Sequence, residues 1–506
     1  MYRIFTASSD TYITNKIINN RFRATDANVG QAGTLDLFKL YNESTVSGES
    51  KPSELSRLLI KFSHDKIKSM HESGLIDVGD KTFKATLKLH DVYGGETTPS
   101  NFKCIVFPLA KKFDEGSGYD IGNYSDLGAT NFITASYDKG IVFDWVLPGA
   151  MKSGSLADAA SIDVIVSGTI PGESVPKALC SEQLFITGEE DLEVDVTSFV
   201  SASVKGLINN YGHLVALSGS HEKDTRSYFV KRFSSRNTPN TSKRPKLIIK
   251  FDDSLIDNRE NFTFNNSGSL YLTNHVRGEL KNIRSGDAPS DILTGENCMI
   301  LKIVTGSFKK IFNVSQVPIG SNRLAGIYSS SFAISSFGDL YDHVQTSGSL
   351  TFDEVWSNSG ETITFLSSSL EIKKSDLNSP DINQTRYHVI VTNLADRYKR
   401  GEVAKVRVFV ENSKREVRLR KTPYEKKSEV FDKMFYRVRD FVSGEIIIPF
   451  GKSDNSTRLS SDSAGMYFNF YMDSLPSGRT FIFEFLIQQG GFDNIISDAP
   501  TKFVVE

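Results

Sequence analysis

The stretch Ser227–Asp252 most constrains the fold of this chain, because it contains two strand-like runs, Tyr228–Phe233 and Lys246–Phe251. In the first run, Tyr228, Val230 and Arg232 alternate with Phe229, Lys231 and Phe233. This period of two is typical of a half-buried strand. The second run is apolar and rich in β-branched residues, as in a central strand. The two runs predict the end of a β-sandwich that opens near Asp10.

The chain before this stretch predicts one strand after another, separated by polar turns. The clearest predicted strands are Thr34–Tyr41, Arg57–Phe62, Phe83–His90, Leu192–Val200 and His213–Ser218. From Lys111 to Ser136, glycine, aspartate and tyrosine dominate without any periodicity. Ordered loops of this length are uncommon unless they carry a function or a contact.

Six motifs follow the order found in DNRLRE domains: DTYI, VGQAGTLDL, RLLIKF, ATLKL, LEVDVTSFV and FSSRNTPNTSKRPKLIIKF. Residues 5–253 therefore resemble this family of disaggregatase-related β-sandwiches, which occur in secreted, carbohydrate-associated proteins. The best match is the turn Ser234–Arg236 with the strand Arg244–Leu247. The resemblance implies a large jelly-roll-like sandwich over residues 1–253. The larger middle of this chain, residues 111–186, departs from the family, so no family binding surface is carried over there.

Two smaller units are predicted after a polar, charged link, Asp252–Asn261. Residues 262–379 contain short strands with Ser/Gly-rich turns and no helix-length periodic segment, which favours an Ig-like sandwich of about 100 residues. Residues 384–506 predict another. There Met466–Met472 and Thr480–Ile487 are expected to form a hairpin, in which Phe481, Phe483 and Phe485 share one face as a core stripe. The predicted fold is therefore all-β, with one large sandwich followed by two smaller Ig-like sandwiches.

The last of these units carries LADRYKRGEVAKVRVFV, FYRVRD, a long run from IIPFGKSDNSTRL to LPSGRTF, and the closing KFVVE. In these motifs residues 384–506 resemble a C-terminal domain of virion structural proteins from large tailed bacteriophages. The resemblance implies a component of the particle, without indicating which part of the particle.

Composition sets further expectations. The 59 Lys and Arg against 61 Asp and Glu give no reason to expect a nucleic-acid binder. Three separated cysteines favour a reduced folding compartment over a disulfide framework. The start MYRIFTASSDTYI does not have the pattern of a signal peptide, and no apolar run predicts a membrane span. We expect synthesis in a host cytoplasm and location in the virion.

No motif predicts catalysis or a cofactor. A nucleophile elbow, a metal-ligand spacing around histidine or cysteine, and a pairable set of glycosidase carboxylates are all unrecognisable in the sequence. The acidic, glycine-rich segment with Asp114, Glu115, Asp120 and Asp126 could offer oxygens to calcium, or could be a solvated turn. We expect a protein that is not an enzyme and holds no cofactor.

Four basic residues are the candidate partner-binding set: Lys405, Arg407, Arg418 and Arg420. Lys405 and Arg407 alternate with valines in Val403–Val410, so both cations are expected to point outward. The functional interpretation is docking onto an acidic neighbour, and the alternative is a solvated strand face. Interspersed glutamates argue against nucleic acid.

The leading function is therefore a structural component of a tailed-phage virion, in the tail, baseplate, neck or head decoration. Such a protein would bind neighbouring virion subunits in multiple copies or as a homo-oligomer, and could contact the host surface. The alternative is a carbohydrate-binding or adhesin module of a surface-associated protein, which the first resemblance suggests. A polysaccharide-degrading enzyme is the third hypothesis.

Overall fold

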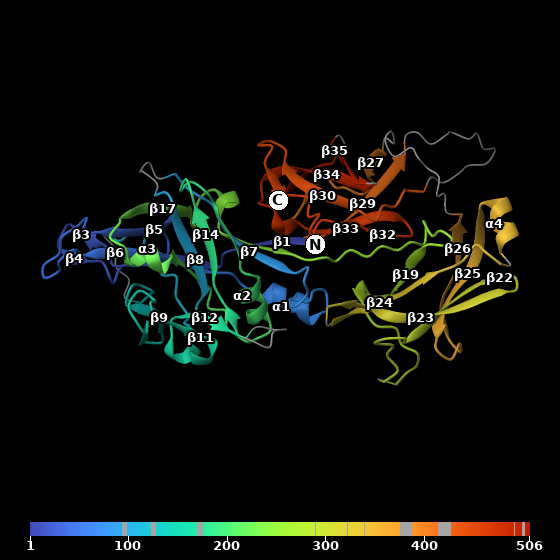
Figure 1. The fold of residues 1–506 in the computed structure, drawn as a ribbon, viewed down its shortest axis with the longest axis horizontal. Coiled ribbons are helices and arrows are strands. Elements are labelled where there is room, and N and C mark those ends of the chain that lie inside the picture. Colours follow the sequence, from blue (N-terminus) through green and yellow to red (C-terminus); the bar gives the residue numbers. More distant parts are fainter. Residues whose placement is uncertain are drawn as a thin grey trace. The chain divides into compact units, whose positions relative to one another are not determined.

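The computed structural model describes residues 1–93, 99–122, 128–169, 176–288, 290–320, 322–338, 340–374, 387–412, 427–489, 491–497 and 501–506. These residues divide into two compact units, which we describe separately. The N-terminal unit comprises Arg3–Ser69 and Phe83–Lys250, and the C-terminal unit comprises Met1–Tyr2, Met70–Thr82 and Phe251–Glu506. The described residues of both units are mostly strand, which confirms the predicted all-β class (Figure 1). The division into three domains stays a prediction.

The N-terminal unit contains two main sheets among its described residues. In spatial order, the larger comprises β14 (Ser181–Phe185), β8 (Phe102–Pro108), β16 (His213–Leu217), β6 (Ser53–Lys61), β5 (Thr34–Tyr41) and β17 (Tyr228–Ser234), with β2 (Ser9–Thr14) paired to β6. The smaller comprises β1 (Tyr2–Thr6), β18 (Lys246–Lys250), β7 (Lys84–Leu89) and β15 (Leu192–Asp195). Because β18 lies between β1 and β7, the predicted central strand is confirmed.

Shorter elements complete this unit. They are β3 (Ile17–Ile18), β4 (Phe22–Arg23), β9 (Thr134–Asp138), β10 (Ile141–Asp144), β11 (Ser153–Ser155), β12 (Val164–Gly168), β13 (Lys177–Ala178), α1 (Asp65–Glu72), α2 (Thr197–Val204) and α3 (Gly219–Lys223). Helix α1 crosses the boundary at Ser69, where the chain enters the C-terminal unit.

The larger sheet is buried on both faces at strand β6. Leu58, Leu59 and Ile60 of β6 are all fully buried, although neighbouring side chains on a strand point to opposite faces. Leu59 packs in one cluster with Trp145, which belongs to the middle segment, residues 111–186. Phe113, Ala135, Ala150 and Val164 of this segment belong to the same cluster, so its described part before β14 covers one face of the sheet.

Strand β17 departs from the regular alternation that its sequence indicates. A register shift against β5 between Tyr228 and Lys231 marks a bulge, which changes the direction of the side chains. Phe229 is exposed as a result, while Lys231 is fully buried. Lys231 Nζ pairs with Asp91 and donates to the main-chain oxygen of Gly188 at 2.7 Å. These partners offset the cost of burying the ammonium group.

The first part of the C-terminal unit forms one continuous antiparallel sheet of six strands among its described residues (Figure 1). Their order is β19 (Ser267–Thr273), β24 (Asn322–Ala333), β23 (Phe308–Ile319), β22 (Met299–Thr305), β25 (Ser349–Asn358) and β26 (Thr364–Lys373). Leu270 of the first edge strand and Leu370 of the last belong to the same buried cluster, so the sheet curves around a single core. Outside the sheet lie β20 (His275–Val276), β21 (Glu279–Leu280) and α4 (Tyr341–Ser347).

The second part of the C-terminal unit is a sandwich of two sheets. One comprises β27 (Tyr387–Val391), β29 (Val403–Asn412), β33 (Gly465–Tyr471) and β32 (Ser460–Asp462). The other comprises β28 (Arg397–Tyr398), β36 (Lys502–Val505), β34 (Arg479–Gln489), β30 (Met434–Asp440) and β31 (Ile446–Ile448), with β35 (Phe492–Ile496) on β34.

The aromatic core of this sandwich confirms one prediction and corrects another. Phe481, Phe483 and Phe485 of β34 are fully buried, as the core stripe predicts, and the Phe483 ring centroid lies 5.2 Å from that of Phe468 on β33. However, β33 and β34 belong to different sheets, so the expected hairpin is wrong. The chain turns through Met472–Ser474 with Leu475 buried, which carries it from one layer to the other.

Candidate functional site

The predicted alternation along β29 is confirmed by burial. Val406, Val408 and Val410 are buried, whereas Lys405 is exposed and Arg407 half-buried. The valines thus anchor the strand in the core, and the two cations lie on its other face. Their role in binding a partner stays a prediction. Arg418 and Arg420 lie outside the described residues.

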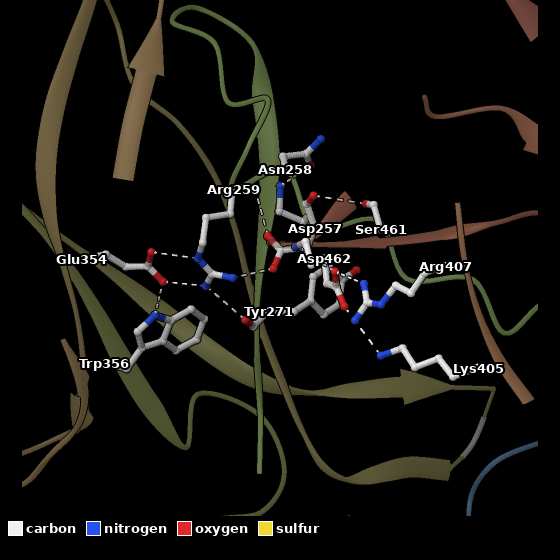
Figure 2. Close-up of polar contacts among 12 residues, drawn as sticks. Asp257, Asn258, Arg259, Tyr271, Glu354, Trp356, Lys405, Arg407, Ser461 and Asp462 are labelled. Atoms are coloured by element: carbon white, nitrogen blue, oxygen red, sulfur yellow. Dashed lines mark hydrogen bonds and ion pairs between the residues drawn. The ribbon is translucent and has the colours of Figure 1, made fainter. Parts of the chain in front are cut away.

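The two outward cations already share a carboxylate from a distant part of the chain. Arg407 Nη1 donates to Asp462 Oδ1, and Lys405 Nζ lies 3.6 Å from Asp462 Oδ2 (Figure 2). Both cations also approach the ring of Tyr467, with Lys405 Nζ 3.9 Å from its centroid. Sequence reasoning missed Asp462, because the pairing of β29, β33 and β32 is needed to bring it there.

The electrostatic consequences of this cluster follow from burial and charge. Burial acts to raise the pKa of Asp462. The hydrogen bonds from Arg407 and from the main-chain nitrogen of Ala464, together with the charges of Arg407 and Lys405, outweigh burial and hold this pKa below its usual value. Partial burial and the neighbouring charge of Arg407 lower the pKa of Lys405, and Asp462 offsets this only in part. The two cations therefore lie close together and share the single carboxylate of Asp462.

The segment Asp252–Asn261, expected from its composition to be an exposed link, is instead attached to β32. Ser461 N donates to Leu255 O at 2.9 Å, and Ile256 forms a parallel bridge with Ser461. Ser461 Oγ also donates to the main-chain oxygen of Asp257 at 3.2 Å. The link is mostly half-buried. It therefore joins the two parts of the C-terminal unit as a packed element.

Arg259, at the end of this segment, enters the interior of the six-stranded sheet and forms a buried ion cluster (Figure 2). Its Nε and Nη2 donate to the two carboxylate oxygens of Glu354 at 3.0 and 2.7 Å, and its Nη1 donates to Asp257 at 2.6 Å. Glu354 is fully buried and also accepts from the indole nitrogen of Trp356. Each charged group in this cluster thus has a charge-assisted partner.

Burial raises the pKa of Asp257 to about 6, and the nearby charge of Arg259 only partly counters this. Burial acts to lower the pKa of Arg259, but Glu354 and Asp257 more than compensate and leave it raised. The guanidinium therefore stays charged. Arg259 is the fixed cation that allows the Glu354 carboxylate to be buried.

A second polar network, in the N-terminal unit, brings together residues from the motifs that resemble DNRLRE domains. Asp10 N donates to Glu115 Oε1 at 2.9 Å, and Arg236 contacts both carboxylates, through its main-chain nitrogen to Asp10 (2.6 Å) and through Nη1 to Glu115 (2.7 Å). Asn28 donates to the main-chain oxygen of Glu115 at 2.9 Å. A side chain at Gly30 would meet that same oxygen at 1.8 Å, so only glycine fits there.

This network bears on the calcium hypothesis for Asp114, Glu115, Asp120 and Asp126. Glu115 is engaged by Arg236, and Asp114 accepts from the main-chain nitrogen of Tyr137 at 2.8 Å. Asp126 lies outside the described residues. No cluster of three or more His, Cys, Asp or Glu side chains suited to a metal ion occurs within the described part of the chain.

Asp10 gives a pH-dependent prediction. Burial raises its pKa from 3.8 to about 7, and the charge of Glu115 adds to this. Because the folded state binds the proton more tightly, Asp10 stabilises the fold below about pH 4, and this contribution is lost as the pH rises through 7. In Asp10→Asn, the free energy of unfolding of the N-terminal unit should therefore fall less between pH 5 and pH 8, by about 2 kcal/mol. Urea titrations at both pH values would test this. The same change in the free energy of unfolding between pH 5 and pH 8 in both proteins would contradict it.

Among the described helices, none is long and apolar enough to cross a membrane. Comparison with known proteins gives little more. No protein-family profile and no curated protein matches this chain.

Solved structures show only distant likeness. A titin fragment shares 8% identity over 50% of this chain and 95% of its own, with a TM-score of 0.15. Dimeric latent PorU from Porphyromonas gingivalis shares 10% over 94% of this chain and 34% of its own, with a TM-score of 0.16. The four N-terminal Ig domains of Dscam1 isoform 7.44 share 8% over 99% and 100%, with a TM-score of 0.15. At these TM-scores the likenesses carry no argument about function.

Proposed function

We propose that this protein is a structural component of a tailed-phage particle, located in the tail, baseplate, neck or head decoration. It acts by binding neighbouring subunits and needs no catalytic residue. The proposal rests on the resemblance of residues 384–506 to virion proteins and on one structural observation, an exposed apolar surface in the N-terminal unit.

We use the name 133–151 apolar surface for the exposed apolar residues on and next to the β9–β10 hairpin. Its members are Ile133, Tyr137, Ile141, Val142, Phe143, Val146, Leu147 and Met151, each between 38 and 59% exposed. Strand β10 pairs with β9, and every one of its four residues is exposed. Large exposed apolar patches on soluble proteins mark interaction sites, since leaving them in water is unfavourable. A neighbouring subunit would bury this surface.

The alternative function, a carbohydrate-binding or adhesin module, usually relies on exposed aromatic side chains. Both tryptophans, Trp145 and Trp356, are buried, and their indole nitrogens donate to Asn131 O and to Glu354. They therefore do not form a platform for a sugar. Exposed tyrosines do occur, since Tyr93 and Tyr119 are 74 and 69% exposed, and these are the aromatic side chains that this alternative could use.

The test is incorporation into particles. Ile141→Ser with Phe143→Ser should leave the fold intact, because these side chains are 59 and 49% exposed, and exposed changes shift stability by only about 0.5 kcal/mol. In a phage carrying both substitutions, purified particles should contain little or none of this protein, measured by quantitative mass spectrometry. Ile311→Ser, at a 47% exposed position of β23, is the matched control.

The same assay tests the basic face of β29. Reversing Lys405 and Arg407 to glutamate would place three carboxylates together at Asp462, so loss of the protein could reflect instability. A triple variant, Lys405→Gln, Arg407→Gln and Asp462→Asn, removes the charges as a set. Reduced incorporation of this variant would place the basic face in the contact. Normal incorporation of both the apolar-surface and the triple variant would contradict assembly through these surfaces.

A further inference from the structure

A cavity of about 280 Å³ lies in the C-terminal unit, beside the basic face of β29. Its apolar wall includes Ile319, Leu324 and Ile327 from β23 and β24, together with Leu255 from the segment before Asp257. Leu324 and Ile327 form a small buried cluster with Val317, against which Leu255 and Ile319 pack. The volume is slightly below the range of roughly 300–1,000 Å³ that is usual for ligand pockets, so only a small ligand would fit.

The rest of the lining carries charged groups of both signs. They are Lys405, Arg458, Asp253 and Asp462, and His275 of β20 also belongs to the lining. Asp462 is already paired with Arg407, and Asp253 lies 2.8 Å from the amino nitrogen of Met1. Each of these carboxylates is therefore already paired with a cation other than Lys405 and Arg458.

The two basic side chains, by contrast, are incompletely paired. Arg458 donates through Nε to the main-chain oxygen of Asp432 at 2.7 Å, which is a neutral partner. Within the described part of the chain, no carboxylate forms an ion pair with Arg458. Lys405 Nζ lies 3.6 Å from an oxygen of Asp462, a carboxylate that it shares with Arg407, and 3.9 Å from the ring centroid of Tyr467, which carries no charge.

From this arrangement we infer a binding site for a small apolar carboxylate, whose aliphatic or aromatic body lies on Leu324 and Ile327 and whose negative group meets Lys405 and Arg458. An apolar body without charge would leave the cations unsatisfied, and a polar anion would leave the apolar wall in water. The carboxylate could belong to a free acid or to the C-terminal residue of another chain. The inference goes beyond the proposed assembly function and does not depend on it.

The test uses octanoate as the probe of a free acid, with 1-octanol as the uncharged control. The probe of a chain terminus is the tripeptide acetyl-Val-Ile-Leu, with its C-terminal amide as control. Isothermal titration calorimetry on the full chain should show one saturable site for octanoate, for the free-acid tripeptide, or for both. The uncharged controls should bind about tenfold more weakly or worse, because they lose the charge-assisted hydrogen bonds. Whichever probe binds more tightly identifies the source.

Two variants assign the binding to this cavity. Lys405→Gln with Arg458→Gln should weaken carboxylate binding about tenfold or more while leaving the octanol response unchanged. Leu280→Trp fills the cavity from a position that is 37% exposed and should abolish binding of every probe, whereas Ile311→Trp, on an exposed face, should not. The inference is overturned if no probe saturates a site, or if binding is the same in all these variants.

Discussion

Replacing Arg259 with methionine is expected to lower the free energy of unfolding of the C-terminal unit by about 3–5 kcal/mol. The substitution keeps an apolar side chain of similar length but leaves the fully buried Glu354 carboxylate without its bidentate partner. Asp257 also loses Arg259, but its pKa of about 6 allows it to take up a proton at modest cost. Most of the expected loss therefore comes from Glu354.

Two features of the chain make this measurement specific. The sequence contains 2 tryptophans, and Trp145 lies in the N-terminal unit while Trp356 lies in the C-terminal unit. In a Trp145→Phe background, fluorescence during urea unfolding reports on the C-terminal unit alone. Adding Glu354→Gln to Arg259→Met should recover much of the stability, since the amide is uncharged and its oxygen still accepts from Trp356. An Arg259→Met protein as stable as its parent would show that the ion cluster contributes nothing.

Ile249→Asp is expected to unfold the N-terminal unit. Ile249 is fully buried in β18, opposite Ala85 on β7, and both neighbouring strands are hydrogen-bonded to β18. An aspartate there loses the buried aliphatic surface and places an unpaired carboxylate in the core, at a combined cost of more than about 4 kcal/mol. This cost is comparable to the whole free energy of unfolding of a typical domain, so the folded state should be lost.

Trp145 fluorescence in a Trp356→Phe background would follow this unit during thermal unfolding. Leu184→Asp is the matched control, because it introduces the same charge into β14 of the same unit at a side chain that is 52% exposed. The control should melt close to its parent. A cooperative transition at the parental temperature in Ile249→Asp would refute the central position of β18.

Local patterns were sufficient to predict most strands of this fold. β7, β18 and the phenylalanine stripe of β34 were predictable because alternation and β-branched runs depend on neighbouring residues. The bulge in β17 and the burial of Lys231 were not, since the partner Asp91 lies 140 positions away and the pairing depends on tertiary register. The hairpin expected around Leu475 failed for a related reason. A short turn with a buried leucine can close a hairpin or connect two layers. The pairing of β33 with β29, and not with β34, decides between these two outcomes.

The site shows the same limit. Alternation predicted that Lys405 and Arg407 point outward. Their pairing with Asp462 could not be predicted, because Asp462 lies 55 residues after Arg407 and reaches it only when β32 pairs with β33. The Arg259–Glu354 pair spans 95 residues and had no motif to indicate it. A polar, charged segment such as Asp252–Asn261 is usually a solvated link. Here its charges are satisfied internally, which composition alone does not reveal.

The attachment of this segment to β32 also has a mechanical consequence. Leu255 exchanges hydrogen bonds with Ser460 and Ser461, and Asp257 is bonded to Ser461 two residues later. In a parallel bridge of this kind, tension along the chain loads the bonds in shear, so they share the force and must break together. A pull on the C-terminal unit is therefore transmitted from one set of strands to the next through this junction.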